Sequence, residues 1–119
     1  MATKPIASLS PPNPIPGLKI YRWANLTLND DGAILELPYL ADKTVQVYGT
    51  FGASGKVVIQ GSNKISDYVW TTLSNPQGDP LDFTTSKIQQ ILENPFVIRP
   101  IVTDGDGTTD LEVIILCRG

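Results

Sequence analysis

The chain has 119 residues, of which 41% are hydrophobic and 18% charged, and its formal net charge is −3. This length suits one globular domain with a substantial core, and the composition excludes a wholly disordered chain. The nine Lys and Arg residues are scattered through an acidic chain, which argues against a nucleic-acid-binding surface. The sequence contains no histidine, so it lacks the commonest general base and the commonest metal ligand.

Cys117 is the only cysteine, so no internal disulfide can form. We expect Cys117 to be a small buried apolar residue on the last strand. The longest apolar run, Val113–Cys117, is far shorter than the ~20 residues that span a bilayer. The N-terminus lacks the apolar segment of a signal peptide. We therefore expect no membrane partner, and a protein that is made in a cytoplasm or assembled into a particle there.

We expect the chain to consist of two regions, an extended N-terminal region over residues 1–17 and a β-rich domain over residues 18–119. Five prolines disfavour a helix in the first region and favour extended chain: Pro5, Pro11, Pro12, Pro14 and Pro16. Two interpretations stay open, a disordered terminus and an extended arm that lies along a neighbouring subunit. The spaced aliphatic residues Ile6, Leu9, Ile15 and Leu18 favour the arm.

The domain begins with alternating strand signals. Residues 19–28 predict a strand with a bend near Ala24, and residues 29–32 predict a turn because Asn, Asp and Gly tolerate positive φ. Residues 33–37 predict a second strand that Pro38 ends, followed by a connection over residues 39–43.

Residues 44–73 predict three successive strands, which we expect to form a meander and half of a β-sandwich. In residues 44–51, the side chains of Val45, Val47 and Phe51 share one face, as the two-residue period of a strand requires. The returning strands cover residues 56–60 and 68–73, after turn signals rich in Gly, Ser and Asn.

The C-terminal third predicts one helix among further strands. After a turn-rich loop, residues 81–84 predict a short strand. Ser86 and Gln89 match a capping box, Ile88, Ile91 and Leu92 share a helical face, and Asn94-Pro95 would end the helix.

A strand over residues 96–103 contains Pro100, which indicates an edge or a bulge there. An acidic hairpin loop follows, and residues 110–117 predict the closing strand. We therefore expect an all-β, jelly-roll-like β-sandwich of about seven to eight strands with one short helix and a Pro-rich N-terminal arm.

The acidic residues predict no catalytic site. Residues 104–110 resemble the start of a calcium loop, but Thr109 and Ile115 stand where an EF-hand needs Gly and Glu. A plain acidic hairpin and an irregular calcium site both stay open. Other carboxylates lie in turn-like sequence, where Asp serves the backbone: Asp30, Asp31, Asp79 and Asp82. We expect no enzyme activity, catalytic residue, metal or cofactor.

Several aromatic residues fall on predicted strands or beside them: Trp23, Trp70, Tyr21, Tyr39, Tyr48 and Tyr68. They could form a sugar-stacking face, or they could be core and interface residues. Both interpretations stay open at this point.

A series of short segments from Val45 onward resembles the small structural proteins of tailed bacteriophages whose genes lie near the capsid gene. The segments are residues 49–51, Val57–Asn63, Trp70–Leu73, Asn75–Gly78, Ile91–Pro95, Ile98–Pro100 and Gly105–Asp110. The resemblance extends over about two thirds of the chain, and its segments reflect turn chemistry more than function. Some members of that group are capsid cement, or decoration, proteins with a jelly-roll or β-sandwich fold, so the resemblance implies such a fold here.

Our leading hypothesis is a non-enzymatic virion protein that binds the outside of a phage capsid and staples neighbouring major capsid subunits. The expected partners are the major capsid protein and further copies of this chain, as a dimer or trimer, on the capsid surface of the virion. The predicted partner-binding residues are Ile6, Leu9, Ile15, Leu18, Tyr21 and Trp23. The alternatives are a carbohydrate-binding module with Trp23, Trp70 or Tyr48 as its stacking platform, and a phage tail or head–tail component.

Overall fold

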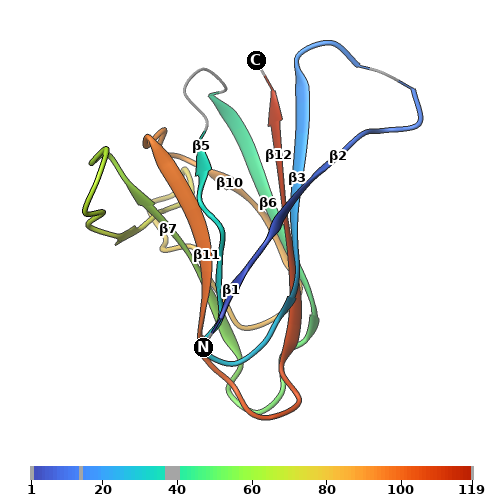
Figure 1. Cartoon of the computed structure of the whole chain (residues 1–119), viewed down its shortest axis with the longest axis vertical. Coiled ribbons are helices and arrows are strands. Elements are labelled where there is room, and N and C mark those ends of the chain that lie inside the picture. The colour runs from blue at the N-terminus through green and yellow to red at the C-terminus, as the bar shows by residue number, and fades with distance from the viewer. Residues whose placement is uncertain (1, 14, 37–40, 119) are drawn as a thin grey trace.

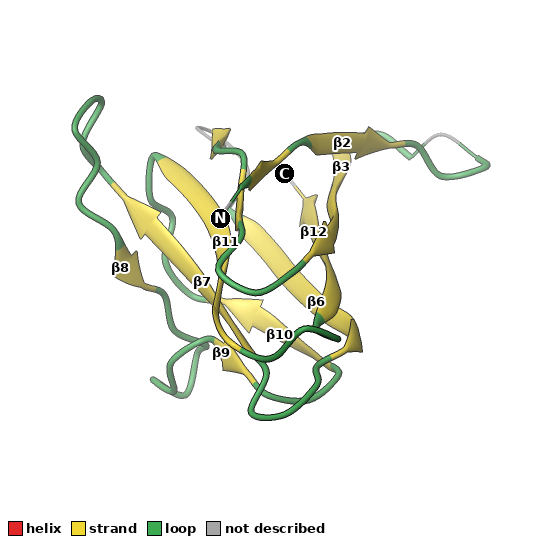
Figure 2. Cartoon of the chain, turned by 60° about the horizontal axis from the view of Figure 1, so that its bottom comes forward, coloured by secondary structure: helices red, strands yellow, loops and turns green. Residues whose placement is uncertain are grey.

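The computed structural model describes residues 2–13, 15–36 and 41–118, and over these residues the chain is an all-β sandwich of two facing sheets (Figures 1 and 2). The β-sandwich prediction is confirmed. The predictions for Pro14, Pro38 and Tyr39 lie outside the described residues. Within the described part of the chain, no helix is long and apolar enough to cross a membrane.

The first sheet has seven strands in the order β1-β4-β11-β7-β8, with β5 beside β11 and β9 beside β7. Its strands are β1 (Thr3–Lys4), β4 (Asp31–Gly32), β5 (Leu35–Glu36), β7 (Lys56–Ser62), β8 (Thr71–Thr72), β9 (Asp82–Phe83) and β11 (Val97–Asp104). Most of these pairings are short, and only β7 and β11 form a long ladder.

The second sheet has five strands in the order β10-β6-β12-β3-β2. Its strands are β2 (Ile6–Leu9), β3 (Leu18–Leu26), β6 (Asp42–Thr50), β10 (Lys87–Ile91) and β12 (Asp110–Arg118). The last strand of the chain, β12, is central and pairs with β6 on one side and β3 on the other.

The core lies between the sheets and follows the alternation of the long strands. Val45 and Val47 of β6 are buried, as predicted, and Phe51 packs against the core from the end of that strand. Strand β12 contributes every second residue, and Trp23 fills the space beneath β3. The buried residues of β12 are Leu111, Val113, Ile115 and Cys117.

The prediction of a helix over residues 86–94 is wrong. This segment contains strand β10, which pairs antiparallel with β6 from Lys87 opposite Val47 to Ile91 opposite Lys43. Its side chains alternate, since Ile91 is buried whereas Ile88 is 60% exposed. The backbone of β6 offers this segment a full ladder of hydrogen bonds, and this tertiary contact overrides a short local helical signal.

The three-strand meander expected over residues 44–73 is also wrong, because β6 and β7 belong to different sheets. The turn at residues 51–55 is an arch between the sheets instead of a hairpin within one. The arch is tight: a Cβ atom on Gly55 would lie 1.9 Å from the backbone oxygen of Phe51. The hydroxyl of Thr109 donates to this oxygen at 2.7 Å and joins the arch to the loop between β11 and β12.

Two predicted irregularities have clear structural counterparts. The bend near Ala24 is a β-bulge, where the register with β12 shifts and Asn25 has φ 56°. Pro100 lies in β11 between the residues that pair with β4 and those that pair with β5, so its missing N–H coincides with a gap between two short strands.

The N-terminal region contributes a strand to each sheet. Strand β1 pairs in parallel with β4, and β2 pairs antiparallel with β3, so the chain crosses from one sheet to the other within a few residues (Figure 1). Ile6 packs against the core. The region predicted as an arm is thus partly a component of the sandwich, and its residues 10–13 and 15–17 lie in the loop before β3.

Asp30 anchors the start of the chain. Its carboxylate, 3% exposed as a residue, accepts hydrogen bonds from the hydroxyl and amide of Thr27 and from the amide of Ala2, and Lys4 lies 3.6 Å away. Burial alone would favour the neutral acid, but these bonds and the Lys4 charge outweigh it and lower the pKa of Asp30 below its ordinary value.

Asp31 ties the same region to β11. Its carboxylate accepts a hydrogen bond from Thr3 at 2.7 Å and is paired with Arg99 at 2.9 Å. Arg99 also donates to Gln60 at 3.0 Å, and its guanidinium lies 4.2 Å from the ring centroid of Trp70. One arginine thus connects β4, β7 and the loop before β8.

We predict that Asp30→Asn lowers the free energy of unfolding at pH 7 by about 1–3 kcal/mol, because buried donors lose a charged acceptor. A carboxyl whose folded-state pKa is lowered stabilises the fold above its unfolded-state pKa of about 3.9 and loses that contribution as the pH falls further. The difference between variant and wild type should therefore shrink below about pH 4 in urea unfolding series. Asp67→Asn, at an exposed carboxylate, is the control, and a difference that stays constant down to about pH 2 would contradict this account.

Candidate functional site

The outer side of the five-stranded sheet carries an unusual number of aliphatic side chains. The pairing register aligns Leu9, Ile20, Leu116 and Thr44 in one row across four strands, and Arg22, Ile114 and Gln46 belong to the next row. Along each strand these residues alternate with the buried ones, so their side chains point away from the core. The outer side of an antiparallel sheet is commonly polar when it faces water.

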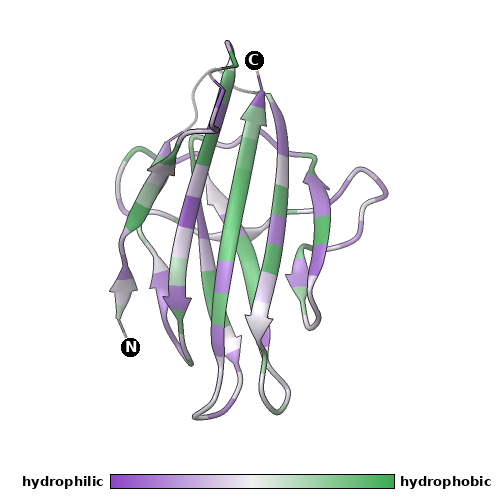
Figure 3. Ribbon diagram, turned by 90° about the vertical axis from the view of Figure 1, so that its right-hand side faces the viewer, coloured by the Kyte–Doolittle hydropathy of each residue, from purple (hydrophilic) through white to green (hydrophobic). Residues whose placement is uncertain are grey.

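We define the outer apolar face as Leu9, Ile15, Leu18, Ile20, Ile114 and Leu116. Figure 3 views this sheet from its outer side, with β12 at the centre and hydrophobic along most of its length. The strand residues of the face are half-buried among one another, and Ile15 is 56% exposed. A contiguous patch of this kind is typical of a surface that contacts another macromolecule.

A recess of about 430 Å³ opens at the end of this face nearest the C-terminus. A turn forms one wall, in which the amide of Leu18 donates to the oxygen of Ile15 at 3.3 Å and Gly17 has φ 75°. Leu116 and Arg118 of β12 form the other wall. The recess is mainly apolar with one cationic group at its rim, which suits an aliphatic or aromatic side chain of a partner beside an acidic one.

The structure separates the predicted partner-binding residues into two groups. Leu9, Ile15 and Leu18 lie on the outer apolar face. Ile6 and Tyr21 are partly buried and pack against the core.

Trp23 is fully buried, and its indole N–H donates to the backbone oxygen of Ala33 at 2.9 Å. The prediction that the Trp23 side chain contacts a partner is therefore wrong. The cause is the strand period, because Tyr21 and Trp23 share the inward face of β3 whereas Leu18 and Ile20 share the outward one.

The structure buries one of the three residues predicted as a sugar-stacking platform and partly covers another. Trp23 is unavailable, and Trp70 is only partly exposed, with one ring face covered by Arg99 and with Tyr68 at 5.3 Å between ring centroids. Tyr48 is 37% exposed, and its hydroxyl donates to Glu112. That hydrogen bond, with burial and the Glu112 charge, raises the pKa of Tyr48 against the opposing charge of Arg22.

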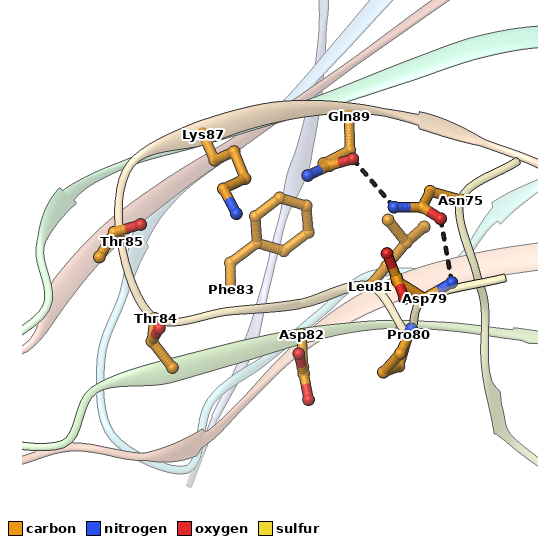
Figure 4. A pocket seen from close by; sticks show the side chains of 10 residues that line it. All are labelled: Asn75, Asp79, Pro80, Leu81, Asp82, Phe83, Thr84, Thr85, Lys87 and Gln89. Atoms are coloured by element: carbon orange, nitrogen blue, oxygen red, sulfur yellow. Dashed lines mark hydrogen bonds between the residues drawn. The ribbon is translucent and has the colours of Figure 1, made fainter. Parts of the chain in front are cut away.

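A polar recess of about 210 Å³ lies beside β9 and β10 (Figure 4). Phe83 forms its floor, with the Lys87 amine pointing toward the ring. The side-chain amide of Asn75 donates to Gln89 at 3.1 Å, and its oxygen accepts from the amide of Asp79 at 3.0 Å. These bonds hold a turn-rich loop against β10, so their structural role is to fix that loop.

The acidic loop between β11 and β12 connects the two sheets, so the hairpin predicted here is wrong. Asp106 organises this loop. Its carboxylate accepts hydrogen bonds from the hydroxyl and amide of Thr108 and from the amide of Ala53. These bonds lower the pKa of Asp106 to about 2. Both carboxylate oxygens thus serve the loop, and the described residues contain no group of three or more side chains suited to hold a metal ion.

Sequence reasoning missed Ile20, Ile114 and Leu116 as surface residues. The signal was present in the continuous apolar run of β12, but such a run normally indicates a strand buried on both faces. Only the sheet order shows that nothing in the described chain covers the outer side of β12.

No protein-family model matches the chain, and no curated protein sequence matches it significantly. Among solved structures, the SPBc2 prophage-derived protein YomS is similar, with a TM-score of 0.65 and 13% sequence identity. The match covers 88% of this chain and 97% of that protein. At this identity the similarity concerns the fold, and its extent indicates that nearly the whole architecture is shared.

Adjacent residues of β12 provide a direct test of the inward and outward assignment. We predict that Ile115→Ala, which empties a fully buried site, lowers the free energy of unfolding by about 2–5 kcal/mol. Leu116→Ala on the outer apolar face should cost about 1 kcal/mol or less. Urea unfolding at neutral pH measures both, and similar losses for the two variants would refute the assignment.

Proposed function

We propose that the chain is a non-enzymatic virion protein of a tailed phage, a jelly-roll-like sandwich that binds the outside of the capsid and staples neighbouring major capsid subunits. The observation that carries this proposal is the outer apolar face with its recess. A sheet side of this composition is stable in water only at a cost, which burial against a partner removes.

The phage setting is supported by the shared fold of the prophage-derived protein YomS, together with the sequence resemblance to small phage structural proteins. The described residues support a binding role over a catalytic one. Their carboxylates serve turns and the N-terminal anchor, as Asp106 and Asp30 illustrate.

The loop between β2 and β3 suits contact with a second capsid subunit. It extends beyond the body of the sandwich (Figures 1 and 2), and its prolines restrict the chain and reduce the entropy lost on binding. Ile15 lies on this loop and also on the outer apolar face. A copy that touches two subunits, or that forms a dimer or trimer on a symmetry axis, gains strength from several weak contacts.

A tail or head–tail component is the alternative that this surface also permits. In a ring, the outer apolar face would lie between copies of the chain, and the mass in solution would be that of the ring. The carbohydrate-binding alternative is weakened, because Trp23 is buried and Trp70 is partly covered, and of its three candidate stacking residues Tyr48 is the one left exposed.

Binding to capsids assembled without this protein tests the proposal. We predict that the double variant Ile114→Ser with Leu116→Ser binds at least about tenfold more weakly than wild type in co-sedimentation, since burial of the two aliphatic side chains against the capsid should together contribute more than about 1.4 kcal/mol. Ile65→Ser is the matched control, because Ile65 is 81% exposed but lies on a loop of the other sheet.

Equal binding by the double variant and wild type would exclude the outer apolar face as the contact. Wild-type protein that does not bind capsids at all would exclude the capsid function. Deletion of residues 1–17 is a poor test, because Thr3 and Ile6 contribute to the sandwich itself.

A further inference from the structure

Lys43 is a buried lysine at the start of β6, only 2% exposed. It lies between Ile91 of β10 and Cys117 of β12 in the pairing register. Its amine donates to the side-chain oxygen of Asn94 and, at 3.2 Å, to the backbone oxygen of Ala41. The amine of this buried residue is therefore in direct contact with a carboxamide from the segment after β10.

Glu93, the residue before Asn94, adds a fixed carboxylate whose charge acts on Lys43. Its two oxygens accept hydrogen bonds from the amide and the hydroxyl of Ser74, which hold the side chain in place. Burial would favour its neutral form, but these bonds, its own amide and the charge of Lys43 lower the pKa of Glu93, so it is ionised at neutral pH. An ionised carboxylate near an amine is a suitable proton acceptor.

The surroundings of Lys43 favour its neutral, nucleophilic form. Burial lowers the pKa of Lys43, and this effect exceeds the opposing influence of Cys117, Asp42 and Glu93. Burial raises the pKa of Cys117 to about 11, so its thiol stays protonated and does not compete as a thiolate.

We propose that Lys43 and Asn94 react to form an intramolecular isopeptide bond that joins β6 to the segment after β10. The geometry that supports this modification site is the contact of a buried amine with a carboxamide, and the next residue along the chain carries a carboxylate that Ser74 holds in place. The bond is independent of the proposed capsid function.

The reaction balances without an oxidant, a metal or a cofactor. Glu93 accepts one proton from the Lys43 ammonium by way of water, and the free Nζ attacks the Cγ carbon of Asn94. The Cγ–Nδ2 bond then breaks as Nζ gives a second proton to the departing nitrogen, and the ammonia so formed takes up the proton held by Glu93. The products are an Nζ–Cγ amide and one ammonium ion. Asn94 is exposed, and a recess of about 280 Å³ beside Asn94 and Glu93 gives the ammonia a path to solvent.

Such a bond would close residues 43–94 into a loop. A cross-link of this kind stabilises the fold mainly by restricting the unfolded chain, as a disulfide does. It would also fasten β10, an edge strand, to β6, which otherwise holds it by a single ladder of backbone bonds.

Intact-mass spectrometry of the purified wild-type protein tests the proposal directly. We predict a mass lower than that of the sequence by one ammonia. Tryptic digestion should yield one branched peptide that joins residues 23–56 to residues 88–118, with Lys43 uncleaved. A full sequence mass, or cleavage after Lys43 with no branched peptide, would overturn the proposal.

Variants separate a covalent bond from a hydrogen bond. Lys43→Met and Asn94→Ala should each restore the full mass and lower the unfolding midpoint by about 10 °C or more, as loss of a cross-link predicts. Glu93→Gln should slow the mass loss in freshly made protein.

Lys19→Met is the matched control, because Lys19 also lies opposite Cys117 but is exposed, and it should leave mass and midpoint unchanged. If Lys43 were only hydrogen-bonded, Lys43→Met would be neutral or stabilising, since a buried ammonium is replaced by an apolar side chain.

Discussion

The strict alternation of β12 is the constraint on which the rest of the structure depends. Its odd-numbered residues, from Leu111 to Cys117, are fully buried and meet the opposite sheet, and its even-numbered residues point outward. Because β12 is central in its sheet, β3 and β6 inherit this division through their register with it. Ile114 and Leu116 are apolar on the outward side, so one strand supplies both the core and the surface that we propose for capsid binding.

A second constraint acts where the two sheets meet at the N-terminus. Asp30 and Asp31 are consecutive buried carboxylates, and each is satisfied by different partners. Asp30 holds the first residues of the chain through Ala2 and Lys4, whereas Asp31 holds Arg99 of the long β7–β11 ladder. Strand β1 is therefore held by charge-assisted hydrogen bonds, and the part that Asp30 contributes is lost at low pH.

The sequence allowed most strands of the sandwich to be predicted, because β6, β7, β11 and β12 have clear two-residue periods or β-branched runs. It did not allow the partners of each strand to be predicted. The segment with Ser86 and Ile91 satisfies a helical pattern locally, and only the free edge of β6 makes it a strand.

The candidate site was also predicted only in part, because strand pairing decides which residues face outward. Leu9, Ile15 and Leu18 are on the outer apolar face, as predicted from their aliphatic side chains. Whether Trp23 points into the core or outward depends on strand register, which a single sequence does not specify. The contact of Lys43 with Asn94 joins two segments far apart in the chain, so no local sequence motif predicts it.

Cryo-electron microscopy of capsids mixed with the purified protein tests the central claim most directly. We predict density for the sandwich at defined symmetry axes, with the outer sides of β3 and β12 against the capsid and the loop before β3 reaching a neighbouring subunit. Density with that side of the sheet exposed to solvent, or capsids without added density, would contradict the account.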